Sequence, residues 1–315
     1  MGENWAMAGG RILRWARQGA GVLLVAAMVL LGLGSGAVVP TGETDRAAAS
    51  DPVPTELPSY PPLPLNYPER NTVPDGGRAS APPAQNEVAT VWDLPSGTLV
   101  LNPASGRREI LNPEVWRTAV LIGDSQSSGA VGVSSAQTWV VRGLAERGYT
   151  VDFVGAGGTG FTAASGRRGN YLDALDSGQM LLPYGNPALV VVQGGGNDAA
   201  RGASDAQILA SATGLLRELQ ASYPRAKFLF IGTLARGGKD GGRRTHVDTL
   251  LAGFAKRNGV PFISTGDWIT RYGVGNKMAD AVHLTEGGHG TLSKVLAARL
   301  KAMKLQGPTL GNARG

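Results

Sequence analysis

From residue 117 onward, two kinds of hydrophobic pattern alternate along the chain. Short, almost uniformly apolar runs are typical of buried strands, and longer segments carry apolar residues at helical spacing. The predicted strands are 118–124, 150–155, 189–195, 227–233 and 261–265. The predicted helices lie at about 136–147, 204–222, 244–258 and 286–304. Apolar strands that alternate with amphipathic helices predict an α/β domain over residues 117–306, with a parallel sheet covered on both faces.

The N-terminal segment has the pattern of an export signal or a membrane anchor. Residues 19–39 form an uncharged apolar run of 21 residues, and arginines precede it. A run of this length can span a bilayer, and positive charge on its N-terminal flank keeps that end in the cytoplasm. We expect residues 1–41 to anchor the protein and the remainder to lie outside the cytoplasm. The alternative is a secreted protein, cleaved near the Ala-x-Ala sequence at Ala47–Ala49.

Two further segments separate this N-terminus from the α/β domain. Residues 40–86 hold 11 of the 19 prolines, so a proline-rich linker over 42–86 should form an extended spacer. Residues 87–94 and 97–103 alternate like strands and are joined through Pro95-Ser96-Gly97, which predicts an accessory β-hairpin within 87–116. Residues 307–315 are expected to be a flexible tail.

Composition excludes several classes of function. The 315 residues are 42% hydrophobic, enough for a core, and the absence of cysteine excludes disulfides, a thiol nucleophile and cysteine-ligated metals. The isoelectric point is about 9.7, but the arginines are scattered and no basic helix with interleaved aromatics occurs. We therefore expect no nucleic-acid partner. The three histidines form no metal-binding motif, so neither a metal nor another cofactor is expected.

Chemically useful residues follow the predicted strands, where open α/β sheets bind their ligands. They occur in four segments, namely Gly123-Asp124-Ser125, the glycine-rich loop 155–162, Gly195-Gly196-Asn197-Asp198, and Asp280-Ala-Val-His283 just before the last helix. Ser125 is placed like a nucleophile, His283 is the natural base, and Asp280 can orient the imidazole. The Ser125 N–H, a glycine N–H of the loop and the Asn197 amide could hold an oxyanion.

The order and spacing of these four segments, over roughly residues 117–304, resemble the SGNH (GDSL) hydrolase superfamily. The resemblance implies a flavodoxin-like three-layer α/β/α sandwich with a five-stranded parallel sheet. It places the oxyanion glycine at Gly160, with Gly157 and Gly158 as open alternatives. Gln126 stands where leucine is familiar in the family, which leaves the subfamily and the substrate open. An ordinary α/β-hydrolase is disfavoured because Gly123–Ser127 lacks the second glycine of G-x-S-x-G.

The resemblance implies an extracytoplasmic serine esterase that forms an acyl-enzyme. Its substrate would be an acyl ester, for instance an O-acyl or O-acetyl group of a cell-envelope glycan or lipid. Acyl transfer by the same residues is the first alternative, and a non-catalytic envelope-binding module is the second. Asp124 and Asp198 are expected to bond loop amides, His289 to pack or cap a helix, and His246 to be exposed.

A basic segment after the fourth predicted strand is the candidate for substrate specificity. Residues 235–244 contain four cationic side chains against the single carboxylate of Asp240, together with four glycines. We expect a mobile loop in which Arg243 and Arg244 attract an anionic substrate at the carboxyl edge of the sheet. A solvated basic loop without a ligand is the alternative.

Overall fold

Five parallel strands form the central sheet, in the order β4-β3-β6-β7-β8. The structure is a computed structural model that describes residues 90–308. The strands are β3 (Thr118–Ile122), β4 (Thr150–Phe153), β6 (Leu189–Gln193), β7 (Phe228–Ile231) and β8 (Phe262–Ile263). In chain order this is second-first-third-fourth-fifth, the order of a flavodoxin-like sheet, and the strand order reverses between β3 and β6. The predicted fold class is confirmed.

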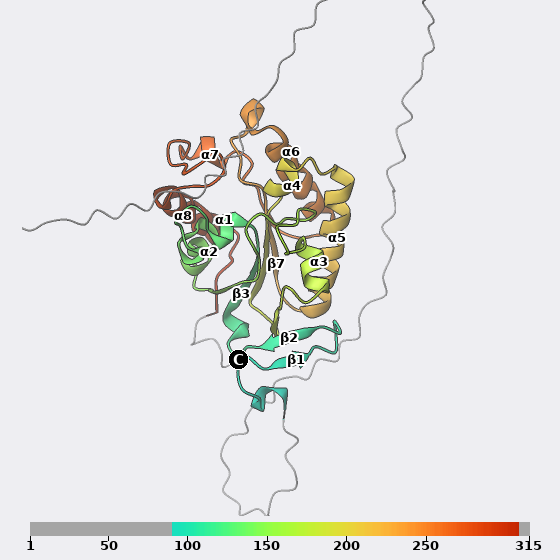
Figure 1. Cartoon of the computed structure of the whole chain (residues 1–315). Coiled ribbons are helices and arrows are strands. Elements are labelled where there is room, and N and C mark those ends of the chain that lie inside the picture. Colours follow the sequence, from blue (N-terminus) through green and yellow to red (C-terminus); the bar gives the residue numbers. More distant parts are fainter. Residues whose placement is uncertain (1–89, 309–315) are drawn as a thin grey trace, which may run out of the picture. The chain divides into compact units, whose positions relative to one another are not determined.

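Helices cover both faces of this sheet, as Figure 1 shows. One apolar core lies under α3, α5 and α6, and the other lies under α2, α7 and α8. All residues of β3 and β6 are buried, which explains why these strands are apolar except for one polar residue at an end of each. The helices are α1 (Ser125–Ser128), α2 (Trp139–Ala145), α3 (Tyr171–Asp176), α4 (Gly196–Ala200), α5 (Asp205–Ser222), α6 (Gly238–Arg257), α7 (Trp268–Arg271) and α8 (Glu286–Ala302).

Helix α6 begins earlier than the sequence predicts and contains a kink. The helix begins at Gly238, so most of the segment that was expected to be a mobile loop is helical. The kink lies at Gly242, whose φ of 49° and ψ of −136° are not helical. Glycine adopts this conformation without the steric cost that other residues meet at positive φ. The expectation of a glycine-rich loop over all of 235–244 is therefore wrong, and Lys239, Arg243 and Arg244 are presented by the start of a helix.

A hairpin forms within the predicted region, but only the predicted strand 97–103 contributes to it, and the partner strand comes from later residues. Strand β1 (Leu99–Leu101) pairs antiparallel with β2 (Arg108–Leu111), and the chain reverses over residues 102–107. The earlier segment instead forms a 3₁₀ turn at Val91–Asp93, capped by the Asp93 carboxylate, which accepts from the Thr90 backbone N–H at 2.6 Å. Strand β2 also pairs in parallel with β5 (Pro183–Tyr184), which makes a second, three-stranded sheet. No sequence pattern had indicated β5.

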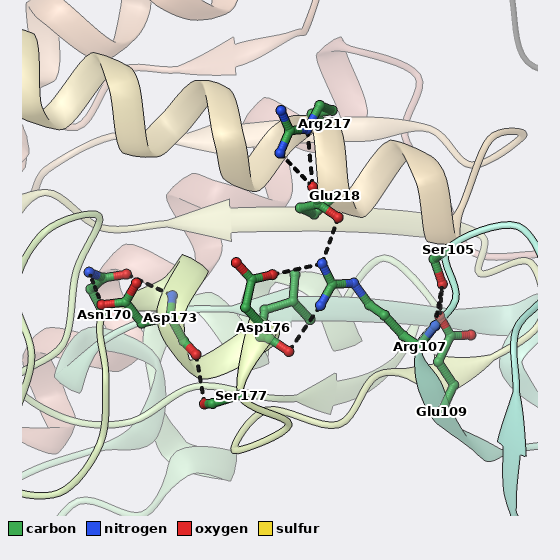
Figure 2. A network of polar contacts seen from close by, with 10 residues as sticks. Ser105, Arg107, Glu109, Asn170, Asp173, Asp176, Ser177, Arg217 and Glu218 are labelled. Carbon is green, nitrogen blue, oxygen red and sulfur yellow. Dashed lines mark hydrogen bonds and ion pairs between the residues drawn. The ribbon is translucent and has the colours of Figure 1, made fainter.

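Ionic contacts join this small sheet to the helices of the α/β domain (Figure 2). The Arg107 guanidinium lies 2.7 Å from the carboxylate of Asp176 in the last turn of α3 and 2.6 Å from that of Glu218 in α5. Beside it, the Glu109 carboxylate is fully buried and accepts from the Asn102 amide at 3.0 Å. Burial raises the pKa of Glu109 to about 7, although these hydrogen bonds oppose the shift. The hairpin is thus held by polar contacts as well as by strand pairing.

The membrane prediction concerns a part of the chain that the structure does not describe. The apolar run 19–39, the linker 42–86 and most of the predicted tail lie outside the described residues. Within residues 90–308, no helix has both the length and the apolar character needed to cross a membrane.

Candidate active site

Ser125 is the first residue of α1, and only Gly123 and Asp124 separate it from the end of β3. The buried carboxylate of Asp124 caps this helix by accepting from the Gln126 backbone N–H at 2.9 Å, as expected for a residue that bonds loop amides. Burial raises the pKa of Asp124 to about 6, against hydrogen bonds that lower it. The cap fixes the turn that presents Ser125 at the carboxyl edge of the sheet.

Gln126, which stands where the resemblance implies leucine, connects two parts of the site. Its side-chain N–H donates to the Val282 carbonyl at 3.1 Å, and its side-chain oxygen accepts from the Trp139 indole N–H at 3.3 Å. The turn that follows Ser125 is thereby bonded to the Asp280–His283 segment. A leucine at this position could make neither hydrogen bond.

Ser125, His283 and Asp280 form a continuous chain of hydrogen bonds. The His283 Nε2 lies 2.9 Å from the Ser125 Oγ, and the His283 Nδ1 lies 2.7 Å from the Asp280 Oδ2. The other oxygen of Asp280 accepts from the backbone N–H groups of Val282 at 2.7 Å and His283 at 2.6 Å. These hydrogen bonds lower the pKa of Asp280 to about 2, and the bond to the His283 ring makes the largest contribution. An ionised Asp280 holds a proton on Nδ1 and leaves Nε2 free to accept from the serine hydroxyl.

The glycine-rich loop after β4 is fixed by the carboxylate of Asp198. That carboxylate accepts from the backbone N–H groups of Phe161 at 3.1 Å, Thr162 at 2.6 Å and Ala163 at 3.0 Å. The expectation that Asp198 bonds loop amides is confirmed. Gly160 lies against the same carboxylate, because a Cβ at Gly160 would be 2.2 Å from the Asp198 Oδ2. The loop therefore requires glycine there for close packing.

Gly160 does not fit the expected role of oxyanion donor. Its N–H already donates to the Ala163 carbonyl at 2.9 Å. Gly157 lies closer to the nucleophile, since a Cβ built on it would be 3.8 Å from the Cβ of Ser125. Among the described residues, the N–H groups of Gly157 and Gly158 have no hydrogen-bond acceptor. The geometry therefore favours the alternatives that the sequence left open, Gly157 and Gly158.

Asn197 lies in the first turn of α4, which follows β6 through Gly195 in a left-handed conformation with φ of 99°. The Asn197 Nδ2 donates to the Thr159 carbonyl at 2.9 Å, which links α4 to the glycine-rich loop. An amide nitrogen carries two hydrogens, so the second remains available to a ligand. Three candidate oxyanion donors thus remain, namely the Ser125 N–H, the Asn197 amide and an N–H of Gly157 or Gly158.

The two arginines predicted to bind substrate have different environments. The Arg243 guanidinium lies 2.6 Å from the Asp205 carboxylate and donates to the Ala203 carbonyl at 2.6 Å, so it is bound to the start of α5. The Arg244 guanidinium instead contacts the α4 turn, because a Cβ on Gly196 would lie 2.7 Å from its Nη1. The prediction for Arg243 does not fit these contacts. That for Arg244 is developed below.

The two remaining histidines take structural positions. His289 is buried, and its Nδ1 accepts a hydrogen bond from the backbone N–H of Trp139, the first residue of α2, at 3.1 Å. The expected packing or capping role is therefore confirmed. Burial lowers the pKa of His289 to about 4. His246 is exposed, as expected, but its Nε2 lies 2.7 Å from the Asp205 carboxylate. Neither histidine contacts Ser125.

Sequence reasoning missed a buried polar layer below the nucleophile. The Ser127 Oγ and the Gln193 side-chain amide lie 2.8 Å apart, and the Tyr171 hydroxyl donates to the Gln193 carbonyl at 2.9 Å. These contacts connect α1, β6 and α3 directly beneath the site. The available signal was Gln193 itself, a polar residue at the end of an otherwise apolar strand.

A serine, a histidine and an ionised aspartate in this geometry, on a flavodoxin-like sheet, define a site of the serine hydrolase type. Residues 121–290 match the GDSL-like lipase/acylhydrolase family, and the chain belongs to this family. It is 35% identical to the esterase TesA of Pseudomonas aeruginosa over 119 residues, which are 37% of this chain and 54% of TesA. The chain thus spans about half the length of that curated relative.

Solved structures with a similar fold include a family two carbohydrate esterase from Clostridium thermocellum. It is 17% identical, with a TM-score of 0.48, and the match covers 61% of this chain and 65% of that one. A crystal structure of TesA is 25% identical, with a TM-score of 0.44, and the match covers 59% of this chain and 99% of TesA.

Proposed function

We propose that the protein is a serine esterase that cleaves an acyl ester through an acyl-enzyme. The observation that carries the proposal is the chain of contacts from the Ser125 Oγ through the His283 ring to the Asp280 carboxylate. A serine hydroxyl is a weak nucleophile, and a base within hydrogen-bond distance activates it. The family membership supports the same reaction class.

In the first half of the reaction, the Ser125 Oγ attacks the ester carbonyl carbon while its proton passes to the His283 Nε2. The carbonyl oxygen gains the electron pair of the broken π bond. It would be held by the Ser125 N–H, the Asn197 amide and an N–H of Gly157 or Gly158. Collapse of this intermediate re-forms the carbonyl and breaks the bond to the alcohol oxygen, which takes the proton from His283. The alcohol leaves and the acyl group stays on Ser125.

In the second half, water attacks the acyl-enzyme and gives its proton to the His283 Nε2. Collapse returns this proton to the Ser125 Oγ and releases the carboxylic acid. Asp280 stays ionised throughout and stabilises the imidazolium that forms in each half, since the pKa of Asp280 is held at about 2.

Turnover of simple esters by the full chain tests this function. The purified protein is expected to hydrolyse 4-nitrophenyl esters of short or medium chain length, and the Ser125→Ala variant should not. Mass spectrometry of a rapidly quenched reaction should find the acyl group on the peptide that contains Ser125. Wild-type protein that releases no acid from any ester, acetylated glycans included, with or without free glycans as acyl acceptors, would contradict the proposal.

We further propose that the enzyme works outside the cytoplasm, on an ester of a cell-envelope glycan or lipid. Support comes from the arginine-flanked apolar run at 19–39 and the proline-rich segment behind it, which together suit an anchor and a spacer. The full chain with a C-terminal tag is expected in the membrane fraction, with the tag accessible to protease from outside. A mature N-terminus after about residue 40 or 49 would replace the anchor with a cleaved signal.

A further inference from the structure

Arg244 lies beside the strand ends that carry the proposed catalytic residues. It follows the kink of α6, and its Nη1 is so close to Gly196 that a Cβ there would be 2.7 Å away. Gly196 immediately precedes Asn197. The positive charge of Arg244 also acts on the carboxylate of Asp124, the neighbour of Ser125. The guanidinium is therefore close to both the nucleophile turn and the α4 turn.

The guanidinium of Arg244 has no bonded partner in the described part of the chain. It is half-buried, yet within residues 90–308 it forms no ion pair and donates no hydrogen bond. Arg243, one residue earlier, is bound to Asp205 and to the Ala203 carbonyl. Burial lowers the pKa of Arg244, and the Asp124 charge opposes that shift. Withdrawing a charged group from water without a partner is unfavourable, so such a group is suited to receive one from a ligand.

We propose that Arg244 determines specificity by binding an anionic group, a carboxylate or a phosphate, that the ester substrate carries near the scissile bond. The inference rests on the proposed esterase function. A planar guanidinium with free N–H donors matches both groups and can bind either in a bidentate manner. Gly196 gives the guanidinium its space, because a side chain there would displace it.

The test compares matched neutral and anionic esters. On the alcohol side these are 4-acetoxybenzamide, 4-acetoxybenzoate and 4-acetoxyphenyl phosphate, and on the acyl side they are 4-nitrophenyl hexanoate and the 4-nitrophenyl monoester of adipic acid. Both kcat and KM are measured for the full-length wild type and for Arg244→Gln, Arg244→Lys and Arg243→Gln. Arg243→Gln is the matched control, since it removes the same charge from the neighbouring residue. Thermal unfolding of each variant shows whether it is folded.

Arg244→Gln is expected to lower kcat/KM for at least one anionic ester by about 10- to 100-fold relative to its neutral partner, mainly through KM. Arg244→Lys should restore part of this preference, and Arg243→Gln should change the ratio by less than about twofold. Added salt should reduce the anionic preference of the wild type and have little effect on Arg244→Gln. The ester whose kcat/KM falls in Arg244→Gln identifies the anion that Arg244 binds. A fall for the benzoate or the phosphate places that anion on the alcohol side of the ester, and a fall for the adipate places it on the acyl side.

Two results would overturn the inference while leaving the esterase function intact. The first is an equal loss of turnover for neutral and anionic esters in Arg244→Gln, which would make Arg244 a positioning residue that acts through Asp124. The second is an unchanged ratio for all three anionic esters. Failure of the wild type to hydrolyse even the neutral esters would instead contradict the proposed function itself.

Discussion

Replacing Asn197 with alanine should separate a loss of catalysis from a loss of stability. The Asn197 Nδ2 donates one hydrogen to the Thr159 carbonyl at 2.9 Å, and the second is free to stabilise the oxyanion. Loss of an oxyanion donor lowers kcat by about 10²–10³, because the donor acts on charge that develops only in the transition state. Loss of the hydrogen bond to Thr159 should cost about 0.5–1.5 kcal/mol of unfolding free energy.

Asn258→Ala provides the matched control. The Asn258 Nδ2 donates to the Phe254 carbonyl at 2.9 Å, at the end of α6 opposite to Arg244, so this variant loses the same kind of hydrogen bond far from Ser125. Both variants should unfold at slightly lower urea concentration than the wild type. Only Asn197→Ala should lose kcat.

Steady-state kinetics on a neutral 4-nitrophenyl ester, together with urea unfolding, measures both effects. KM for this ester should change little in Asn197→Ala. A raised KM with unchanged kcat would make Asn197 a residue that binds the substrate in its ground state. An equal loss of kcat in Asn258→Ala would attribute the effect to stability, and either result would refute the oxyanion assignment.

Three further predictions concern the catalytic residues and the hairpin. Ser125→Ala and His283→Ala should each remove nearly all turnover, and the double variant should be little worse than either, because the two residues act as one unit; a Ser125→Ala variant that keeps a tenth of the activity would contradict the assignment. Asp280→Asn should lower kcat by about 10²–10⁴ with unchanged folding by circular dichroism, because an amide does not hold the required tautomer of His283; wild-type kcat would remove Asp280 from the mechanism. Burial raises the pKa of Glu109 from 4.5 to about 7, so the folded protein binds more protons than the unfolded chain between these values. The free energy of unfolding should therefore fall by up to about 3 kcal/mol as pH rises from about 5 to above 7, and Glu109→Gln should flatten this slope in urea titrations. The same slope in Glu109→Gln as in the wild type would show that another group causes it.

The strands, the main helices and the order of the four segments could be predicted because each depends on local sequence. Short apolar runs of five to seven residues between turn signals indicate buried strands, and glycine, serine or asparagine after such a run indicates a site at the sheet edge. The contact between Ser125 and His283 bridges 158 positions. It was nevertheless predictable, because Ser125 follows a predicted strand and His283 lies just before the last predicted helix, within the same set of motif segments.

The details that failed depend on contacts between distant residues. Gly160 was expected to donate to the oxyanion, but Asp198, far along the chain, fixes the loop so that the Gly160 N–H bonds to Ala163. Arg243 and Arg244 are adjacent in sequence, yet consecutive side chains on a helix point about 100° apart, and only Arg243 meets Asp205. The sequence motif identifies which residue types are present but not which of their N–H groups are already occupied.

Environment also explains why two aspartates near one serine have different roles. Asp280 is largely exposed and accepts from two backbone N–H groups and the His283 ring, which hold its pKa at about 2 and keep it charged beside the imidazole. Asp124 is buried next to Ser125, its pKa is raised to about 6, and its carboxylate caps α1 instead of touching the histidine. A permanent charge suits the group that must stabilise an imidazolium, whereas a buried cap is suited to fixing the nucleophile turn. The unpaired charge of Arg244 acts on this buried carboxylate, so the substrate anion that we propose would compete with Asp124 for the same guanidinium.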